Sequence, residues 1–115
     1  MDFYIRAIIN KLGLKDIEFA SAVTNITENG IEAYYPDPDG KILTNNFKIS
    51  YTRRFLEQGY RVVYMGNGLS DFAAAKHCQY IYAIETLAKE CDKHGVPYKS
   101  FTNLNEIADD LKELL

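Results

Sequence analysis

The residues whose types and spacing could do chemistry lie in one short segment, Gly66-Asn67-Gly68-Leu69-Ser70-Asp71. Glycines at its first and third positions let backbone amide groups approach a bound anion, and the carboxylate at its end could bind or orient a cation. On spacing alone, the segment fits either an anion site or a plain turn between a strand and a helix.

The elements that must position this segment lie directly on either side of it. Residues 61–65 are mostly apolar and predict a short strand that is buried on both faces. Ser70 or Asp71 is placed to cap a helix that begins near Phe72. Proteins of the α/β class gather ligands at such places, outside the carboxyl ends of parallel strands.

Composition narrows the range of partners. The length of 115 residues predicts one domain, residues 1–115, with a single core. The net charge is -3. The sequence has no basic stripe for nucleic acid, and no apolar run that approaches the roughly 20 residues of a membrane helix. Cys78 and Cys91 match no metal-binding spacing. They predict free thiols in a reducing compartment, the cytoplasm.

The first part of the chain predicts a helix followed by a hairpin. Apolar residues recur at helical spacing over residues 3–12, and Gly13 ends that helix. Residues 17–26 predict a strand. The pair Asn29-Gly30 predicts a tight turn because it supplies two positive φ angles at low cost. Residues 31–35 then return as an antiparallel strand.

From residue 47 onward, helices and strands alternate. The pattern predicts helices over 47–58, 71–77, 85–94 and from 104 to the end, with strands over 60–65, 80–83 and 96–98. Asn103 and Glu106 form a capping box for the last helix. Alternation of this kind predicts a parallel sheet with right-handed crossovers. We therefore expect an α/β fold, a Rossmann-like three-layer parallel sheet with helices on both faces, plus a β-hairpin.

Residues 64–75 and the segments that follow them carry a resemblance to a known family. Tyr64-Met65-Gly66-Asn67-Gly68-Leu69-Ser70-Asp71-Phe72-Ala73-Ala74-Ala75 precedes Tyr80-Ile81-Tyr82-Ala83 and Gly95-Val96-Pro97-Tyr98. This pattern resembles the carboxyl-terminal half of haloacid dehalogenase-like phosphatases. Within that superfamily it is similar to the phosphoserine phosphatase-like branch, which includes methionine-salvage enolase-phosphatase enzymes. The family's fourth motif has the form Gly-Asp-Gly-x-Ser-Asp.

The resemblance implies roles for individual residues. Family members use an aspartate nucleophile, a magnesium ion and a lysine that steadies the charge on the phosphoryl group. Lys48, eighteen positions before Gly66, matches that catalytic lysine. Asp71 matches the second acid of the fourth motif, and Asn67 stands where the first acid usually binds Mg²⁺. Gly66, Gly68 and Ser70 then belong to the phosphate loop, and the substrate is a phosphorylated small molecule.

Two departures from the family pattern bear on activity. The 115 residues contain no Asp-x-Asp-Gly-Thr nucleophile motif and no second-motif Ser or Thr. In addition, Asn67 is neutral, which removes one negative charge from the place where the family holds a hard cation. Asp37-Pro38-Asp39-Gly40 looks like part of the missing motif, but its prolines and the lysine that follows predict a turn. We expect the chain to be inactive alone.

The missing strands have a structural consequence. In the family, the nucleophile strand lies beside the fourth-motif strand, so residues 60–65 would here present an unpaired edge. We expect either that the hairpin closes onto the main sheet, or that the edge pairs with a second copy of this chain or a separate amino-terminal subunit. Three hypotheses follow: a phosphatase-derived domain completed elsewhere, a non-catalytic binding or assembly module, and, least favoured, a hydrolase that uses Asp37 or Asp39.

Overall fold

The computed structural model describes residues 2–114 and divides the chain into two compact units, Met1–Phe47 and Lys48–Leu115. We call these unit 1 and unit 2, and each is described by itself. The chain contains both helices and strands, with an antiparallel sheet in unit 1 and a parallel strand pair in unit 2. The predicted α/β class is confirmed, and the parallel part corresponds to a partial Rossmann-like core.

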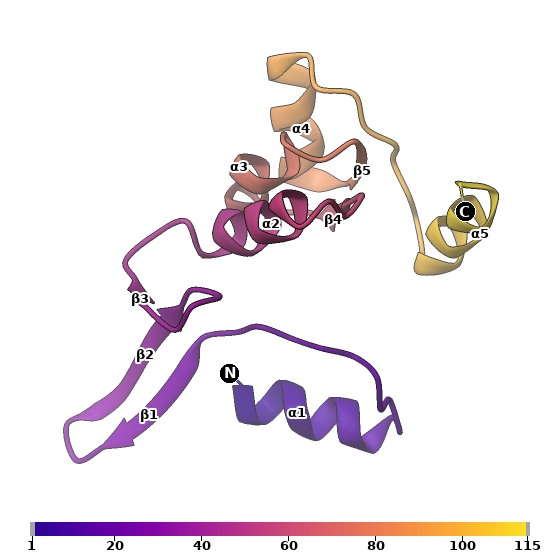
Figure 1. The fold of residues 1–115 in the computed structure, drawn as a ribbon. Coiled ribbons are helices and arrows are strands. Elements are labelled where there is room, and N and C mark those ends of the chain that lie inside the picture. Colours follow the sequence, from indigo (N-terminus) through magenta and orange to yellow (C-terminus); the bar gives the residue numbers. More distant parts are fainter. Residues whose placement is uncertain (1, 115) are drawn as a thin grey trace. The chain divides into compact units, whose positions relative to one another are not determined.

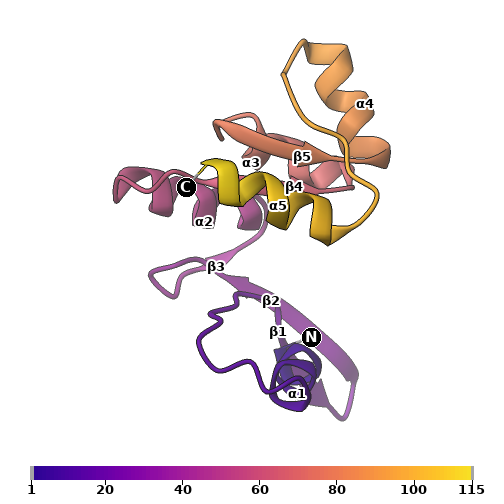
Figure 2. The ribbon, with the colours of Figure 1, turned by 90° about the vertical axis from the view of Figure 1, so that its right-hand side faces the viewer.

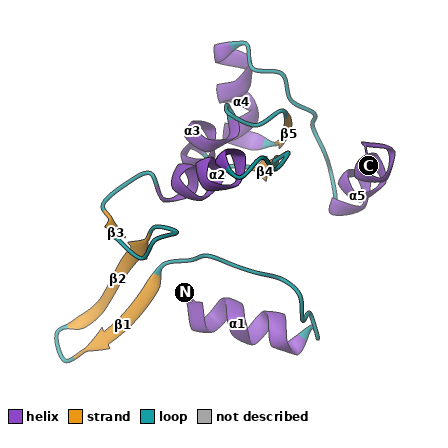
Figure 3. Ribbon diagram, in the orientation of Figure 1, coloured by secondary structure: helices purple, strands orange, loops and turns teal. Residues whose placement is uncertain are grey.

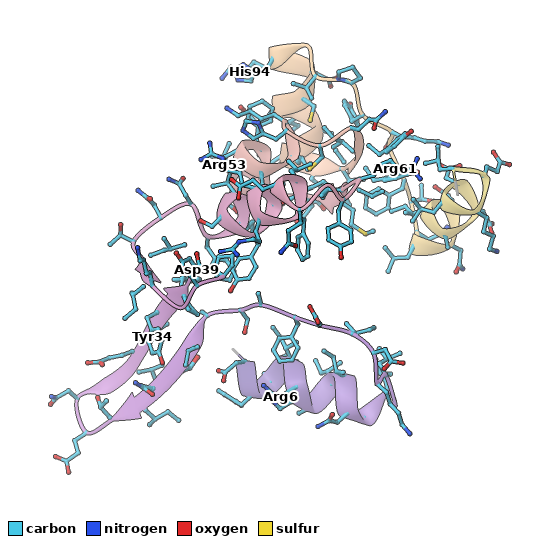
Figure 4. All side chains as sticks on the ribbon, in the orientation of Figure 1. Arg6, Tyr34, Asp39, Arg53, Arg61 and His94 are labelled. Carbon is cyan, nitrogen blue, oxygen red and sulfur yellow. The ribbon has the colours of Figure 1, made fainter. Side chains whose placement is uncertain are left out.

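Unit 1 begins with helix α1 (Asp2–Lys11) and continues into an antiparallel sheet of strands β1 (Val23–Thr27), β2 (Gly30–Pro36) and β3 (Ile42–Leu43) (Figures 1 and 3). Asp2 Oδ1 accepts a hydrogen bond from the backbone N–H of Thr24 at 3.4 Å, which ties the helix to β1. Arg6, labelled in Figure 4, places its guanidinium 5.2 Å from the centre of the Phe19 ring.

The hairpin confirms the predicted turn and corrects two details. β1 and β2 pair with Thr27 opposite Gly30, so the turn residues are Glu28 and Asn29. Gly30 has a φ of +126°, whereas Asn29 does not have a positive φ. The predicted strand over residues 17–26 is shorter, because residues 17–22 form no strand. Among the described residues, 17–22 have no neighbouring strand with which to form backbone hydrogen bonds, so they are not part of a sheet.

Unit 2 is built around strands β4 (Val63–Gly66) and β5 (Tyr80–Ala83), which pair in parallel and run side by side in Figure 2. Helices α2 (Phe47–Glu57), α4 (Glu85–His94) and α5 (Leu104–Leu114) accompany them, with a 3₁₀ turn η1 (Leu69–Asp71) and the short helix α3 (Phe72–Ala75) between the strands. The segment after α4 extends the pairing: Lys99 forms an isolated parallel bridge with Tyr82. The bounds of β5 and α4 agree with the prediction.

The core of unit 2 lies between β5, α3 and α4. It consists of Ala75, Cys78, Ile81, Ala83, Leu87 and Cys91. Because side chains alternate along a strand, Ile81 and Ala83 face this cluster while Tyr82 points the other way, where its hydroxyl donates to Asp110 Oδ2 of α5 at 3.3 Å. Helices therefore pack on both faces of the strand pair, as a layered α/β fold requires.

Some predicted burial is wrong. β4 is not buried on both faces, since Met65 is 45% exposed, and β4 pairs with no other strand than β5 among the described residues. In α5 (Leu104–Leu114), Ile107 is buried, whereas Leu104 at the start of the helix is exposed. No residue of α1 is buried. The hairpin forms its own sheet with β3 and does not join the β4–β5 pair.

Candidate functional site

The loop that follows β4 is folded around one carboxylate, Asp71. Its Oδ2 accepts hydrogen bonds from the backbone N–H groups of Asn67, at 3.1 Å, and Gly68, at 2.8 Å. Asp71 was expected to cap the helix that follows, but its side chain makes no such bond to α3. It turns back instead and accepts hydrogen bonds from the amides of Asn67 and Gly68.

The other oxygen of Asp71 contacts two side chains. Lys48 Nζ lies 2.5 Å from Oδ1, and the Tyr64 hydroxyl donates to the same oxygen at 3.0 Å. Lys48 Nζ also donates to Ser70 Oγ at 3.0 Å. Lys48 comes from the first turn of α2, Tyr64 from β4, and the two amides from the loop after β4. Three separate segments therefore converge on the Asp71 carboxylate.

The pKa directions follow from this packing. Asp71 is only 6% exposed, and burial alone would raise its pKa. The bonds from Lys48, Gly68 and Tyr64 outweigh burial and hold the pKa of Asp71 below its ordinary value. Burial and the adjacent Asp71 carboxylate raise the pKa of Tyr64 well above its ordinary value. The site at neutral pH therefore holds an ionised Asp71 beside a protonated Tyr64.

Gly66 is required by the close approach of this carboxylate. A Cβ atom built at position 66 would lie 2.6 Å from Asp71 Oδ2 and 2.7 Å from its Cγ, well inside van der Waals contact. At position 68 the same Cβ would lie 3.4 Å from Oδ2. The first glycine of the segment is therefore needed for space, because the Asp71 side chain occupies the volume that any larger residue would need.

The residues to which the resemblance gives roles lie in this one region. Lys48, Ser70 and Asp71 are in direct contact, and Gly66 and Gly68 border the Asp71 carboxylate. Asn67 shares in it through its backbone N–H, whereas its side-chain amide points to another partner, Glu85 Oε2, at 3.0 Å. Asp37 instead closes its own turn, where Oδ1 accepts bonds from the backbone N–H groups of Asp39 and Lys41.

Glu85 was missed by sequence reasoning. It occupies the first position of α4, where an acidic residue is ordinarily explained by the helix dipole. The signal that could have found it is the parallel order of the strands, which brings the residues after β4 and those after β5 to the same edge of the sheet.

The donor set does not amount to a magnesium site. Both oxygens of Asp71 are already occupied by hydrogen-bond donors, and Asn67 contributes no charge. Within residues 2–114, no three His, Cys, Asp or Glu side chains gather in a way that could hold a metal ion. The residues present therefore do not by themselves fit the Mg²⁺ that the resemblance implies.

A cavity of about 340 Å³ lies elsewhere in unit 2, and its lining includes Tyr80, Tyr82, Tyr98, Lys99 and Asp110. Lys99 is paired there with Asp110, and this contact raises the pKa of Lys99. Neither Lys48 nor Asp71 lines this cavity. We assign the candidate site to the Asp71 cluster, because that is where a cation, a hydroxyl and backbone amides converge.

Comparison with known proteins gives relatives along nearly the whole chain. A protein of Exiguobacterium sibiricum named 2-hydroxy-3-keto-5-methylthiopentenyl-1-phosphate phosphatase is 26% identical over 115 residues, which cover 97% of this chain and 52% of the relative. A protein of Bacillus cytotoxicus with the same name is 26% identical over 119 residues, covering 100% of this chain and 53% of the relative. No family model matches the chain, and no solved structure matches it significantly.

The relatives named above are about twice as long as this chain. The chain spans about half the length of the curated relatives it matches. The similarity supports a HAD-like phosphatase, to part of which this chain corresponds, and it does not distinguish one branch of that superfamily from another. No helix among the described residues is long and apolar enough to span a membrane.

Proposed function

We propose that this chain is a phosphoryl-binding part of a HAD-like phosphomonoester hydrolase, in which Lys48 and Ser70, beside the Gly66–Gly68 loop, hold the phosphoryl group of a small molecule. The observation that carries the proposal is the contact of Lys48 Nζ with both Asp71 and Ser70, at 2.5 and 3.0 Å. Asp71 holds the ammonium beside the loop. Lys48 remains 45% exposed, so it is open to an anionic ligand.

Each residue has a defined task in this proposal. The Lys48 ammonium offsets the charge of phosphoryl oxygens, and Ser70 Oγ offers a hydroxyl close to it. Asp71 does not contact the phosphoryl group in this proposal. It holds Lys48 in place and fixes the conformation of the loop by accepting hydrogen bonds from the amides of Asn67 and Gly68. Tyr64 stays protonated and donates to Asp71. A bound Mg²⁺ would supply further charge at the phosphoryl group, but its ligands would have to come in part from outside the described cluster.

The atom that attacks phosphorus is assigned to no residue of this chain. The sequence contains no Asp-x-Asp-Gly-Thr motif, and Asp37 and Asp39 lie in a turn of unit 1 that bonds to itself. We therefore propose that the 115-residue chain binds phosphate without hydrolysing phosphate esters. We treat residues 1–115 as one partial domain, since the relatives align along the whole of it.

Binding of inorganic phosphate tests this proposal. Titration of the ¹⁵N-labelled chain, followed by NMR, is expected to shift the backbone resonances of Gly68 and Ser70, and Lys48→Met is expected to abolish these shifts. Lys99→Met, which removes a lysine paired with Asp110 on the other side of β5, is the matched control and is expected to keep them. Equal loss of the shifts in both variants, or no shift in the unmodified chain, would contradict the proposal.

A generic aryl phosphate with Mg²⁺ tests the absence of hydrolysis. We expect no turnover above background. Turnover that Asp71→Ala abolishes would show that the chain does carry out the reaction, and the proposed division between binding and bond formation would then be wrong.

A second candidate function, an assembly module, is favoured by the edge of β4. This strand pairs only with β5 among the described residues, and Met65 beside that edge is 45% exposed. Unpaired strand edges associate readily with another strand. We propose a second copy of the chain or a separate amino-terminal subunit as the partner. Size-exclusion chromatography with light scattering is expected to give a mass that rises with concentration, and a monomer at all concentrations would count against self-pairing.

A further inference from the structure

The contact of Asn67 with Glu85 joins two loops that the sequence keeps eighteen residues apart. Asn67 Nδ2 donates to Glu85 Oε2 at 3.0 Å. Two backbone bonds run beside it: the N–H of Ile84 donates to Gly66 O at 3.3 Å, and the N–H of Leu87 donates to Asn67 O at 3.1 Å. The loop after β4 is therefore fastened to the turn between β5 and α4 by one side-chain bond and two backbone bonds.

The backbone of Glu85 is unusual in a way that fits this contact. Its φ is +53°, in the left-handed region that residues other than Gly, Asn and Asp rarely adopt. Such conformations persist where the surrounding structure holds them, and they gather at functional sites. Here the left-handed residue is the one whose carboxylate reaches the candidate site.

We infer that Glu85 is a positioning residue of this site and that it acts through Asn67. An Asn side chain has one donor end and one acceptor end. Because Glu85 takes the donor end, the oxygen Oδ1 is the end that Asn67 leaves for a ligand. The contact also explains why an amide suits position 67: a carboxylate there would face the Glu85 carboxylate at about the distance of a hydrogen bond, where like charges repel.

The role of Glu85 in ligand binding rests on the proposed function. The test of the Glu85–Asn67 contact does not depend on that function. In ¹⁵N-edited NMR spectra, the two Nδ2 protons of Asn67 are expected to have well-separated shifts and slow exchange with water. In Glu85→Ala they are expected to move to the values of an unbonded Asn side chain. The backbone N–H resonances of Asn67 and Gly68 are expected to stay, because Asp71 binds those groups. Glu90→Ala, which removes another acid of α4, is the control.

A charge exchange gives a second, independent measurement. Asn67→Asp is expected to lower the melting midpoint by about 2–4 °C, since it places two carboxylates side by side. Adding Glu85→Gln to that variant puts the carboxylate at position 67 and the amide at position 85. This exchange restores a hydrogen bond between the two side chains and is expected to recover most of the lost melting temperature. The single variant Glu85→Gln keeps an acceptor oxygen and is expected to retain the Asn67 signals.

Two outcomes would overturn the inference. One is a set of Asn67 side-chain resonances that Glu85→Ala leaves unchanged. The other is an Asn67→Asp, Glu85→Gln double variant that is no more stable than Asn67→Asp alone. Neither measurement uses phosphate or a phosphate ester, so a failed phosphate titration and a failed test of Glu85 are distinguishable.

Discussion

Asp71 carries the largest number of contacts in the candidate site, and its ionised state is what those contacts recognise. Its two oxygens accept bonds from one ammonium, one phenol and two backbone amides. Bonds to a charged acceptor are about twice as strong as neutral ones. The carboxylate therefore acts as an anchor for the loop, and its protonation should loosen the loop and release Lys48.

The first prediction follows from the pKa of Asp71, which is lowered from its ordinary value of 3.8. A lowered pKa in the folded state contributes stability that is present above pH 3.8 and is lost as the pH falls from there through the folded-state pKa. We expect Asp71→Asn to lower the free energy of unfolding by about 2 kcal/mol at pH 7.

Urea unfolding at a series of pH values checks this prediction. The difference in stability between the unmodified chain and Asp71→Asn is expected to stay constant from pH 7 to pH 5 and to shrink below pH 3.8. A difference that stays constant down to the lowest pH measured would mean that ionisation of Asp71 is not what the loop recognises.

The sequence grouped residues that lie together in the structure, but it did not indicate all of their partners. Lys48 and Asp71 were paired through a resemblance, and they are in contact at 2.5 Å. Glu85 could not be found in this way, because its contact with Asn67 joins two loops and depends on the parallel register of β4 and β5. Its left-handed φ also has no signature in the residue type.

At the scale of elements, the turn from β4 into η1 is shaped by the space that Asp71 takes up. A Cβ at position 66 would overlap the Asp71 carboxylate, whereas one at position 68 would touch it at 3.4 Å. The two glycines look alike in the sequence, and only the structure separates their roles.

The second prediction uses this difference. Gly66→Ala is expected to push the Asp71 side chain away from the loop amides and to lower the free energy of unfolding by about 1–3 kcal/mol, as overpacking usually does. Gly68→Ala is the matched control and is expected to cost clearly less. Chemical denaturation of both variants measures the stability, and the backbone resonances of Asn67 and Gly68 report whether Asp71 still binds them. Equal losses in the two variants would contradict the predicted crowding.

Elements were predicted well where neighbouring residues decide them. The bounds of α4 and β5 agree with the prediction because a Gly95 cap at φ +66° and a run of apolar residues are local signals. Strand 17–26 and strand 60–65 were predicted too long, and only residues 23–27 and 63–66 are paired. Strand length depends on the partner strand, which a single segment of sequence does not contain.

At the scale of the whole molecule, the two units differ in what they bury. Ala22 is the only buried residue among those described in unit 1, whereas unit 2 contains a cluster that includes Leu87 and Cys91 at 0% exposure. Many large apolar residues of unit 1 are exposed: Phe3, Tyr4, Ile8, Leu12, Leu14, Ile17, Ile26, Ile31, Tyr35 and Ile42. A segment that buries this little apolar surface cannot offset the entropy lost on folding.

The third prediction is that the chain has one cooperative core and that it lies in unit 2. In hydrogen exchange followed by mass spectrometry, amides of α4 and β5 are expected to exchange only by global unfolding. Those of α1 are expected to exchange within minutes, since a helix of 10 residues with no buried side chain gains little stability from packing. Leu87→Ala is expected to speed exchange throughout unit 2, because it removes a fully buried side chain and costs about 2–5 kcal/mol. Leu104→Ala, at a position that is 65% exposed, is the control. Protection of α1 equal to that of α4 would show that unit 1 contributes to the core, and a separate unfolding transition within residues 2–47 would show that it has one of its own.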